Sequence, residues 1–213
     1  DSRINSDLFN FSETEIKADT ADYNLKSKTT DGYSFIAENA NTNINFDQKL
    51  TTFHLNTDSS VVKFPEIQYI TKLTDFEYDM QDKILRMQEK GKPDRELLPR
   101  DQLIRQDLNN PERPNFIATG TMGDTIQFAS RKASYHIDEE YIEAENINYI
   151  RIADALIQPE NGRITIGRRA KIDQLQNAIV AINNRHILHS AKITIESKKK
   201  YSGSGIYDYV DEA

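Results

Sequence analysis

Two histidines are the first residues whose types and spacing could carry chemistry. His186 and His189 are three residues apart, a spacing that on a helix would place both imidazoles on one face, where a carboxylate could complete a metal site. The isoleucine-rich residues 179–182 and 193–195 on either side indicate strands instead. Because residues i and i+3 of a strand point to opposite faces, we predict that these histidines bind no metal.

Two further groups of residues lack the pattern that a calcium site or a phosphate-binding loop requires. The carboxylates of residues 138–140 lie between two isoleucines, as a hairpin turn would, and lack the loop spacing of a calcium site. The glycines of residues 203–205 follow a run of lysines, but no Lys-Ser/Thr pair opens a helix after them, as a phosphate loop needs. We therefore predict no catalytic residue, no metal and no cofactor, and a chain that is not an enzyme.

A basic run is the remaining candidate site. It alternates with Ile164, Ile166 and Ile172 and consists of Arg163, Arg168, Arg169 and Lys171. On the polar face of a sheet these residues would form a positive stripe for an anionic lipid or a glycan. The alternative is that they are surface charges that discourage edge-to-edge pairing of strands.

Composition favours strands and excludes several functions. The 213 residues include 10 Tyr, 9 Phe and no Trp, and isoleucines recur in alternating patterns after residue 116. A net charge of −7 argues against a nucleic-acid partner. The absence of Cys excludes disulfides and thiolate sites, and no apolar run is long enough to span a membrane as a helix.

A short pattern that ends in tyrosine occurs three times. Tyr23, Tyr78 and Tyr135 close residues 21–23, 76–78 and 133–135, at spacings of 55 and 57 residues. A second element, Ala-Glu-Asn, ends at Asn39 and again at Asn146. We predict three stacked units in which these residues hold equivalent structural positions, each tyrosine ring inward and its hydroxyl near solvent.

Residues 88–115 interrupt this pattern. They hold four of the six prolines, and Leu103, Ile104 and Leu108 have helical spacing. We predict a polar insertion with one short helix, laid on the surface between β-repeat units in residues 1–87 and 116–213, and removable at a cost of about 1 kcal/mol. In the first unit, alternation slips by one residue between Ala18 and Ala21, which indicates a bulge or a corner.

Residues 16–23, Ile-Lys-Ala-Asp-Thr-Ala-Asp-Tyr, followed by Phe-Ile-Ala-Glu-Asn at 35–39, resemble the repeat of the OstA family. That family includes the periplasmic bridge proteins of lipopolysaccharide transport, and the resemblance implies an open β-jellyroll with an apolar groove for acyl chains. The second copy lacks the Ala-Asp pair, and the third has Ser130-Arg131 in its place. Residues 151–155 and 201–207 look more like the very large repetitive β proteins of the Bacteroides-type cell envelope.

The expected fold is therefore all-β, a repetitive β-solenoid or a β-jellyroll-like stack. The expected function is a non-catalytic structural or lipid- or ligand-binding segment of a larger protein in the bacterial envelope, in the periplasm or at the outer membrane. Its partners would be the rest of that polypeptide or other envelope proteins. The alternative is a secreted glycan-binding protein or a carbohydrate-active β-helix. An open apolar trough would favour lipid transport, and we expect the terminal strand within residues 201–213 to pair along one edge only.

Overall fold

Antiparallel strands build almost the whole chain. The computed structural model describes residues 2–57, 59–89, 91–109, 111–120 and 125–209. Strands account for 55% of the chain and helices for 6%, which confirms the all-β prediction. Every ladder among the described strands is antiparallel, whereas the coils of a parallel β-helix pair in parallel.

Most strands are short, and only five of the described strands exceed six residues. Their bounds are β1 Ser2–Asn5, β2 Phe9–Phe11, β3 Glu15–Lys26, β4 Tyr33–Asn45, β5 Leu50–Leu55, β6 Val62–Phe64, β7 Tyr69–Thr71, β8 Asp75–Asp79, β9 Ile84–Gln88, β10 Phe116–Ala118, β11 Gln127–Phe128, β12 Lys132–His136, β13 Tyr141–Glu145, β14 Ile150–Ile152, β15 Ala155–Gln158, β16 Ile164–Gly167, β17 Lys171–Ile172, β18 Leu175–Ile182, β19 His186–Ser197 and β20 Lys200–Tyr207. One α-helix, α1, spans Leu103–Asn109, and two short 3-10 turns span Glu160–Gly162 and Arg168–Ala170.

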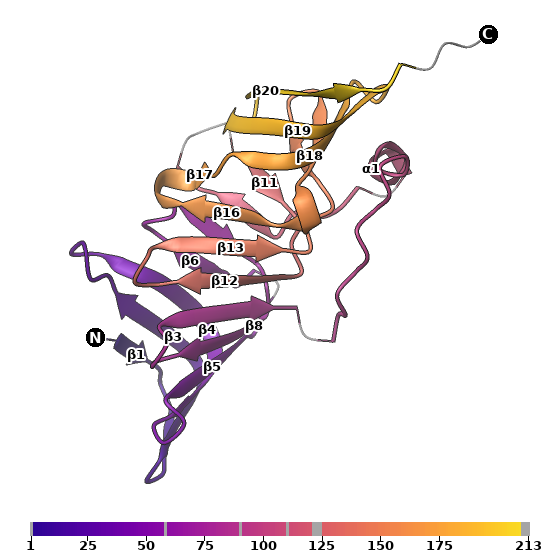
Figure 1. The fold of residues 1–213 in the computed structure, drawn as a ribbon. Coiled ribbons are helices and arrows are strands. Elements are labelled where there is room, and N and C mark those ends of the chain that lie inside the picture. Colours follow the sequence, from indigo (N-terminus) through magenta and orange to yellow (C-terminus); the bar gives the residue numbers. More distant parts are fainter. Residues whose placement is uncertain (1, 58, 90, 110, 121–124, 210–213) are drawn as a thin grey trace.

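The strands form two arms of one open sheet, which we name layer A and layer B. The long hairpin β3–β4 belongs to both, because its two halves pair with different neighbours. Layer A continues through β5, β8, β9, β12, β13, β16 and β17. Layer B continues through β6, β7, β10, β11, β14, β15 and β18. In Figure 1 the strands follow one another from the N-terminal hairpin to β20 at the opposite end.

The chain bends where it passes from one layer to the other. The β3–β4 register shifts between Ala18 and Ala21, which confirms the predicted bulge or corner. Thr20 and Asn39 lie at this bend with φ of 53° and 52°. Such left-handed backbone turns the strand direction locally and is most accessible to Gly, Asn and Asp.

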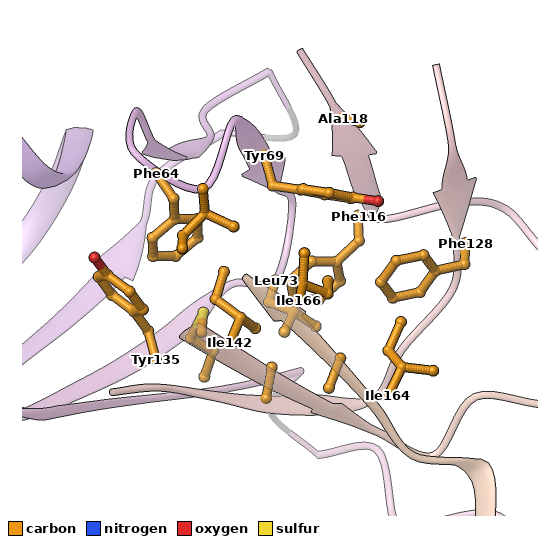
Figure 2. Close-up of a cluster of buried hydrophobic side chains, with 14 of the residues drawn as sticks. Phe64, Tyr69, Leu73, Phe116, Ala118, Phe128, Tyr135, Ile142, Ile164 and Ile166 are labelled. Carbon is orange, nitrogen blue, oxygen red and sulfur yellow. The ribbon is translucent and has the colours of Figure 1, made fainter. Parts of the chain in front are cut away.

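The core fills the space between the two layers. Inward side chains form rows across successive strands, and in layer A one row runs through Tyr78, Leu85 and Tyr135. Rings from opposite layers touch: Phe64 of β6 and Tyr135 of β12 have centroids 5.2 Å apart. Figure 2 shows this region, where the two rings meet edge to face within the buried cluster. The inward faces therefore pack against each other as a filled core.

The insertion is held firmly against layer B, with α1 inside residues 88–115 as predicted. Leu103 is fully buried in a second, smaller core with Tyr149, Leu156 and Ala181, which come from β15, β18 and the approach to β14. Arg95 extends the contact, because its guanidinium donates to the Asn146 carbonyl oxygen at 2.7 Å. These contacts do not fit the expectation of an insertion that can be removed at little cost. Removing it would expose the apolar side chains that Leu103 covers and would break the hydrogen bond from Arg95.

The helix offers a matched pair of substitutions that tests this. Leu103 is 0% exposed and Leu108 is 64% exposed, although both are leucines of α1. Leu103→Ala should lower the free energy of unfolding by about 2–5 kcal/mol, because it empties a buried site. Leu108→Ala should change it by less than about 0.5 kcal/mol. Urea denaturation of the two variants measures both values, and equal effects would show that α1 is not docked on layer B.

Candidate functional site: structural positions, a polar hollow and two sheet edges

The three repeated tyrosines are all buried but do not occupy three equivalent positions. Tyr78 and Tyr135 are register partners of the same residue, Leu85, so they stand in one row of layer A. Tyr23 lies in the half of β3 that pairs with β1 and β4 in layer B. Phe35 joins the two groups, with ring centroids 5.7 Å from Tyr23 and 5.8 Å from Tyr78. Tyr78 and Tyr135 thus share a row, and Tyr23 lies in the other layer.

For Tyr135, one of the three repeated tyrosines, the hydroxyl does not lie near solvent as expected. The Tyr135 hydroxyl is buried and so is that of Tyr69 on β7. Burial raises the pKa of both groups well above the ordinary value, and it raises the pKa of Tyr78 to about 12. The cause in each case is desolvation, which disfavours the tyrosinate.

These pKa shifts predict cooperative alkaline unfolding. In the unfolded chain a tyrosine ionises near pH 10, so above about pH 10 the unfolded state loses its protons first. The stabilisation from Tyr78 is complete below that pH and is lost as the pH rises towards 12. Tyrosinate absorbance should therefore rise together with loss of far-UV circular dichroism. Tyr78→Phe should move this transition to higher pH, whereas Tyr209→Phe, an exposed position, should not.

The repeated asparagines mark points where the chain crosses between layers. Asn146 has φ of 62° and lies between β13 of layer A and β14 of layer B, as Asn39 lies at the bend of β4. The Asn39 backbone N–H donates to the Asp22 carboxylate at 3.0 Å. The Asn146 side-chain oxygen accepts from the Arg95 backbone N–H at 2.7 Å. Both residues therefore serve the fold by adopting left-handed backbone at a crossing.

The basic residues do not form one stripe. Arg163 precedes β16 and pairs with Glu145 at 3.3 Å, whereas Arg168 follows β16 and pairs with Glu140. Arg169 lies in the same turn as Arg168, and Lys171 is exposed on β17. β16 has only four residues and lies between these charges. Arg163 is therefore at one end of the strand, and Arg168 and Arg169 are at the other.

The turns on the side opposite the crossings hold the two layers together. The buried carboxylate of Glu140 accepts from the hydroxyl of Thr29 in the β3–β4 turn as well as pairing with Arg168. Lys28 pairs with Asp138 at 2.5 Å. The Ala170 backbone N–H donates to the Ile67 carbonyl at 2.8 Å. The carboxylates of residues 138–140 thus lie in a turn, as predicted, and contact layer B.

The two histidines lie on β19 and contact Tyr207 at the end of β20 and Asp208 directly after it. His186 Nδ1 lies 3.2 Å from the Tyr207 hydroxyl, and His189 Nε2 lies 3.2 Å from the Asp208 carboxylate. Within the described residues no group of three or more His, Asp or Glu side chains could hold a metal ion. The described histidines therefore help to attach β20 to the rest of the sheet.

A polar hollow of about 790 Å³ lies on layer A, and sequence reasoning missed it. Its lining comes from seven strands, β3, β4, β5, β8, β9, β12 and β13. Most lining side chains alternate with buried core residues such as Phe53 and Phe76, which places the hollow on the outer face. They form two outward rows: Lys17, Asn43, Thr52, Glu77, Arg86 and Ser134, and then Asn41, His54, Asp75, Gln88, Lys132 and Glu145. Only the pairing of strands distant in sequence brings these rows together.

Both ends of the sheet finish in strands paired along one edge. Among the described strands β20 pairs with β19 alone, as predicted, and β1 and β2 pair with β3 alone; Val210, also expected in the last strand, lies outside the described residues. Large apolar side chains are exposed at each end, Phe11 being 71% and Ile206 54% exposed. Figure 1 places β1 and β20 at opposite ends of the body.

Comparison of the chain with protein-family models, with curated proteins and with solved structures found no match. Among the described residues no helix has the length and apolar character needed to cross a membrane.

Proposed function

We propose that this chain is a non-catalytic structural segment that joins end to end with further β structure of a longer assembly in the bacterial envelope. The observation that carries the proposal is the pair of unpaired strand edges at opposite ends, each beside exposed apolar side chains. A contact between two different edges is heterologous, so it repeats along an axis instead of closing a dimer.

The C-terminal edge has the properties of an edge that accepts another strand. Proteins usually protect exposed edges with lysines, prolines, bulges or inward charges. β20 begins at Lys200 and its register with β19 shifts twice, but its middle is Ser-Gly-Ser-Gly, residues 202–205, whose small side chains leave the outer edge of the backbone uncovered. Ile206 and Tyr207 follow as exposed apolar residues that a partner would cover.

The two ends are also similar in shape. β20 pairs with both halves of the long strand β19, so its free edge extends over both layers. At the other end β1 extends the layer B half of β3, and β2 extends the layer A half. Each end thus presents a bent edge that spans the two layers, which is the match that end-to-end pairing requires.

The packed interior supports a structural role over lipid transport. Transport of acyl chains needs an apolar groove that stays open, and the resemblance to the OstA family would imply one. The space between the layers is instead occupied by contacting rings such as Phe35 and Tyr78. We therefore propose the two-layer, jellyroll-like arrangement of that family without an acyl-chain cargo in this segment.

Engineered cysteines test the proposed contact, because the chain contains no Cys of its own. Phe11→Cys and Ile206→Cys proteins, mixed in equal amounts and oxidised, should form 11–206 dimers in preference to 11–11 or 206–206 dimers. Thr165→Cys, on the outer face of layer A, is the control and should cross-link with neither. Sedimentation velocity should show association that grows with concentration and is lost when residues 200–213 are removed. A chain that stays monomeric at hundreds of micromolar and gives no 11–206 product would overturn the proposal.

Gly203 provides a subtler test of the C-terminal edge. A Cβ atom at this position would lie 2.1 Å from the Lys192 carbonyl oxygen, so β20 approaches β19 closely only because residue 203 is glycine. Gly203→Ala should displace β20, raise hydrogen exchange of the amides of residues 200–207 and reduce the 11–206 cross-link. Gly167→Ala is the matched control, since its Cβ would meet no atom nearer than 3.9 Å. Unchanged exchange in Gly203→Ala would show that the edge strand is not held by this contact.

A further inference from the structure

We propose that the polar hollow on the outer face of layer A binds an uncharged oligosaccharide. The hollow is separate from the two strand edges, so this inference does not depend on end-to-end joining. It has about 790 Å³ and is lined by two outward rows of side chains across seven neighbouring strands. With strands roughly 4.8 Å apart, its floor extends about 29 Å, which suits a chain of several sugar rings better than one ring.

The charges of the lining disfavour an ionic ligand. Lys17, Arg86 and Lys132 are cationic, whereas Asp19, Asp75, Glu77 and Glu145 are anionic. Opposite signs lie side by side: Arg86 is the register partner of Glu77, and Lys132 is the partner of Glu145. A polyanion or polycation would therefore meet repulsion along the whole floor.

Hydroxyl groups match this lining, because each hydroxyl both donates and accepts a hydrogen bond. The cationic groups donate, the carboxylates accept, and the amides of Asn41 and Gln88 do both. The Asn43 amide oxygen stands in the floor, opposite Thr52, and is buried without a hydrogen-bond partner among the described residues. Because this oxygen has no exposed surface, a sugar hydroxyl could bond to it only after the Asn43 side chain turns outward, so it is not part of the proposed contact.

The existing contacts leave Arg86 most available to a ligand, whereas Lys17 and Lys132 pair with Glu15 and Asp94, each at 2.7 Å. Arg86 reaches Glu77 and Asp79 only at 3.8 and 3.9 Å, so its donors are weakly engaged. The His54 ring is instead held by Asp75 at 2.9 Å, which fixes one polar wall of the hollow. A peptide partner is less suitable, because peptides are usually recognised at a sheet edge and this surface is a sheet face.

A glycan array that contains neutral, anionic and basic oligosaccharides tests the proposal with the full chain. We expect the neutral members to be retained in preference to both charged classes. The best neutral oligosaccharide is then titrated by calorimetry against the Arg86→Ala/Gln88→Ala double variant, for which we expect at least tenfold weaker binding. Ser134→Ile, which adds bulk to the centre of the floor, should weaken binding to a similar extent.

Thr165→Ile is the matched control. Thr165 continues the outward row of Ser134 through Glu143 but lies outside the hollow, so this variant should bind like the unaltered chain. Thermal unfolding checks that all variants fold. Retention of charged oligosaccharides only, retention of none, or equal affinity of the folded floor variants and the unaltered chain would overturn the proposal.

Discussion

Contact between aromatic rings of the two layers is the interaction on which the rest of the structure depends. Many strands here have only two to five residues, too few to be stable as a single layer in water. Facing layers are about 10 Å apart, and large side chains such as Phe64 and Tyr135 bridge that distance. Phe35 contacts rings from both layers and so joins the N-terminal hairpin to the rest of the core. The short strands persist because each contributes one or two residues to this shared interior.

A second constraint follows, since the chain must cross repeatedly from one layer to the other without leaving backbone groups unpaired. Left-handed residues make these corners, and asparagine supplies them at residues 39, 146, 161 and 177. Crossings also bond to one another: the Ile147 N–H donates to the Gly162 carbonyl at 3.0 Å. The insertion is itself the crossing from β9 to β10, and its Arg95 bonds to the next crossing at Asn146. This explains why a segment that is polar and rich in proline is nevertheless anchored.

The features that could be predicted from the sequence are those set by residues close together in the chain. Alternation located the strands, the slip between Ala18 and Ala21 located a corner, and helical spacing located α1. The sequence could not assign strands to layers, because Tyr23 and Tyr78 end similar patterns and yet lie in different layers. That difference arises from pairing between strands far apart in the chain.

The candidate site was harder to predict for the same reason. The basic run seemed to be one stripe because alternation alone does not reveal that β16 ends at Gly167. The burial of Leu103 depends on Leu156 and Ala181, more than 50 residues away. The hollow likewise needs seven strands in register, and Arg86 and Ser134 become neighbours only where β9 pairs with β12. Local sequence patterns thus predict single strands and helices. A site built across many strands can be located only once it is known which strands pair.

The hollow and the free edges are connected through the geometry of layer A. The floor of the hollow begins at Lys17 on β3, one strand from the free edge of β2. A strand added beside β2 would extend the outer face from the end where the hollow begins, so the polar rows could continue into the next segment. The packed core favours the same arrangement, because rings that contact each other between the layers leave the outer face as the surface that a ligand can reach. End-to-end joining and a polar outer face are therefore compatible uses of one sheet, the first through its edges and the second through its side chains.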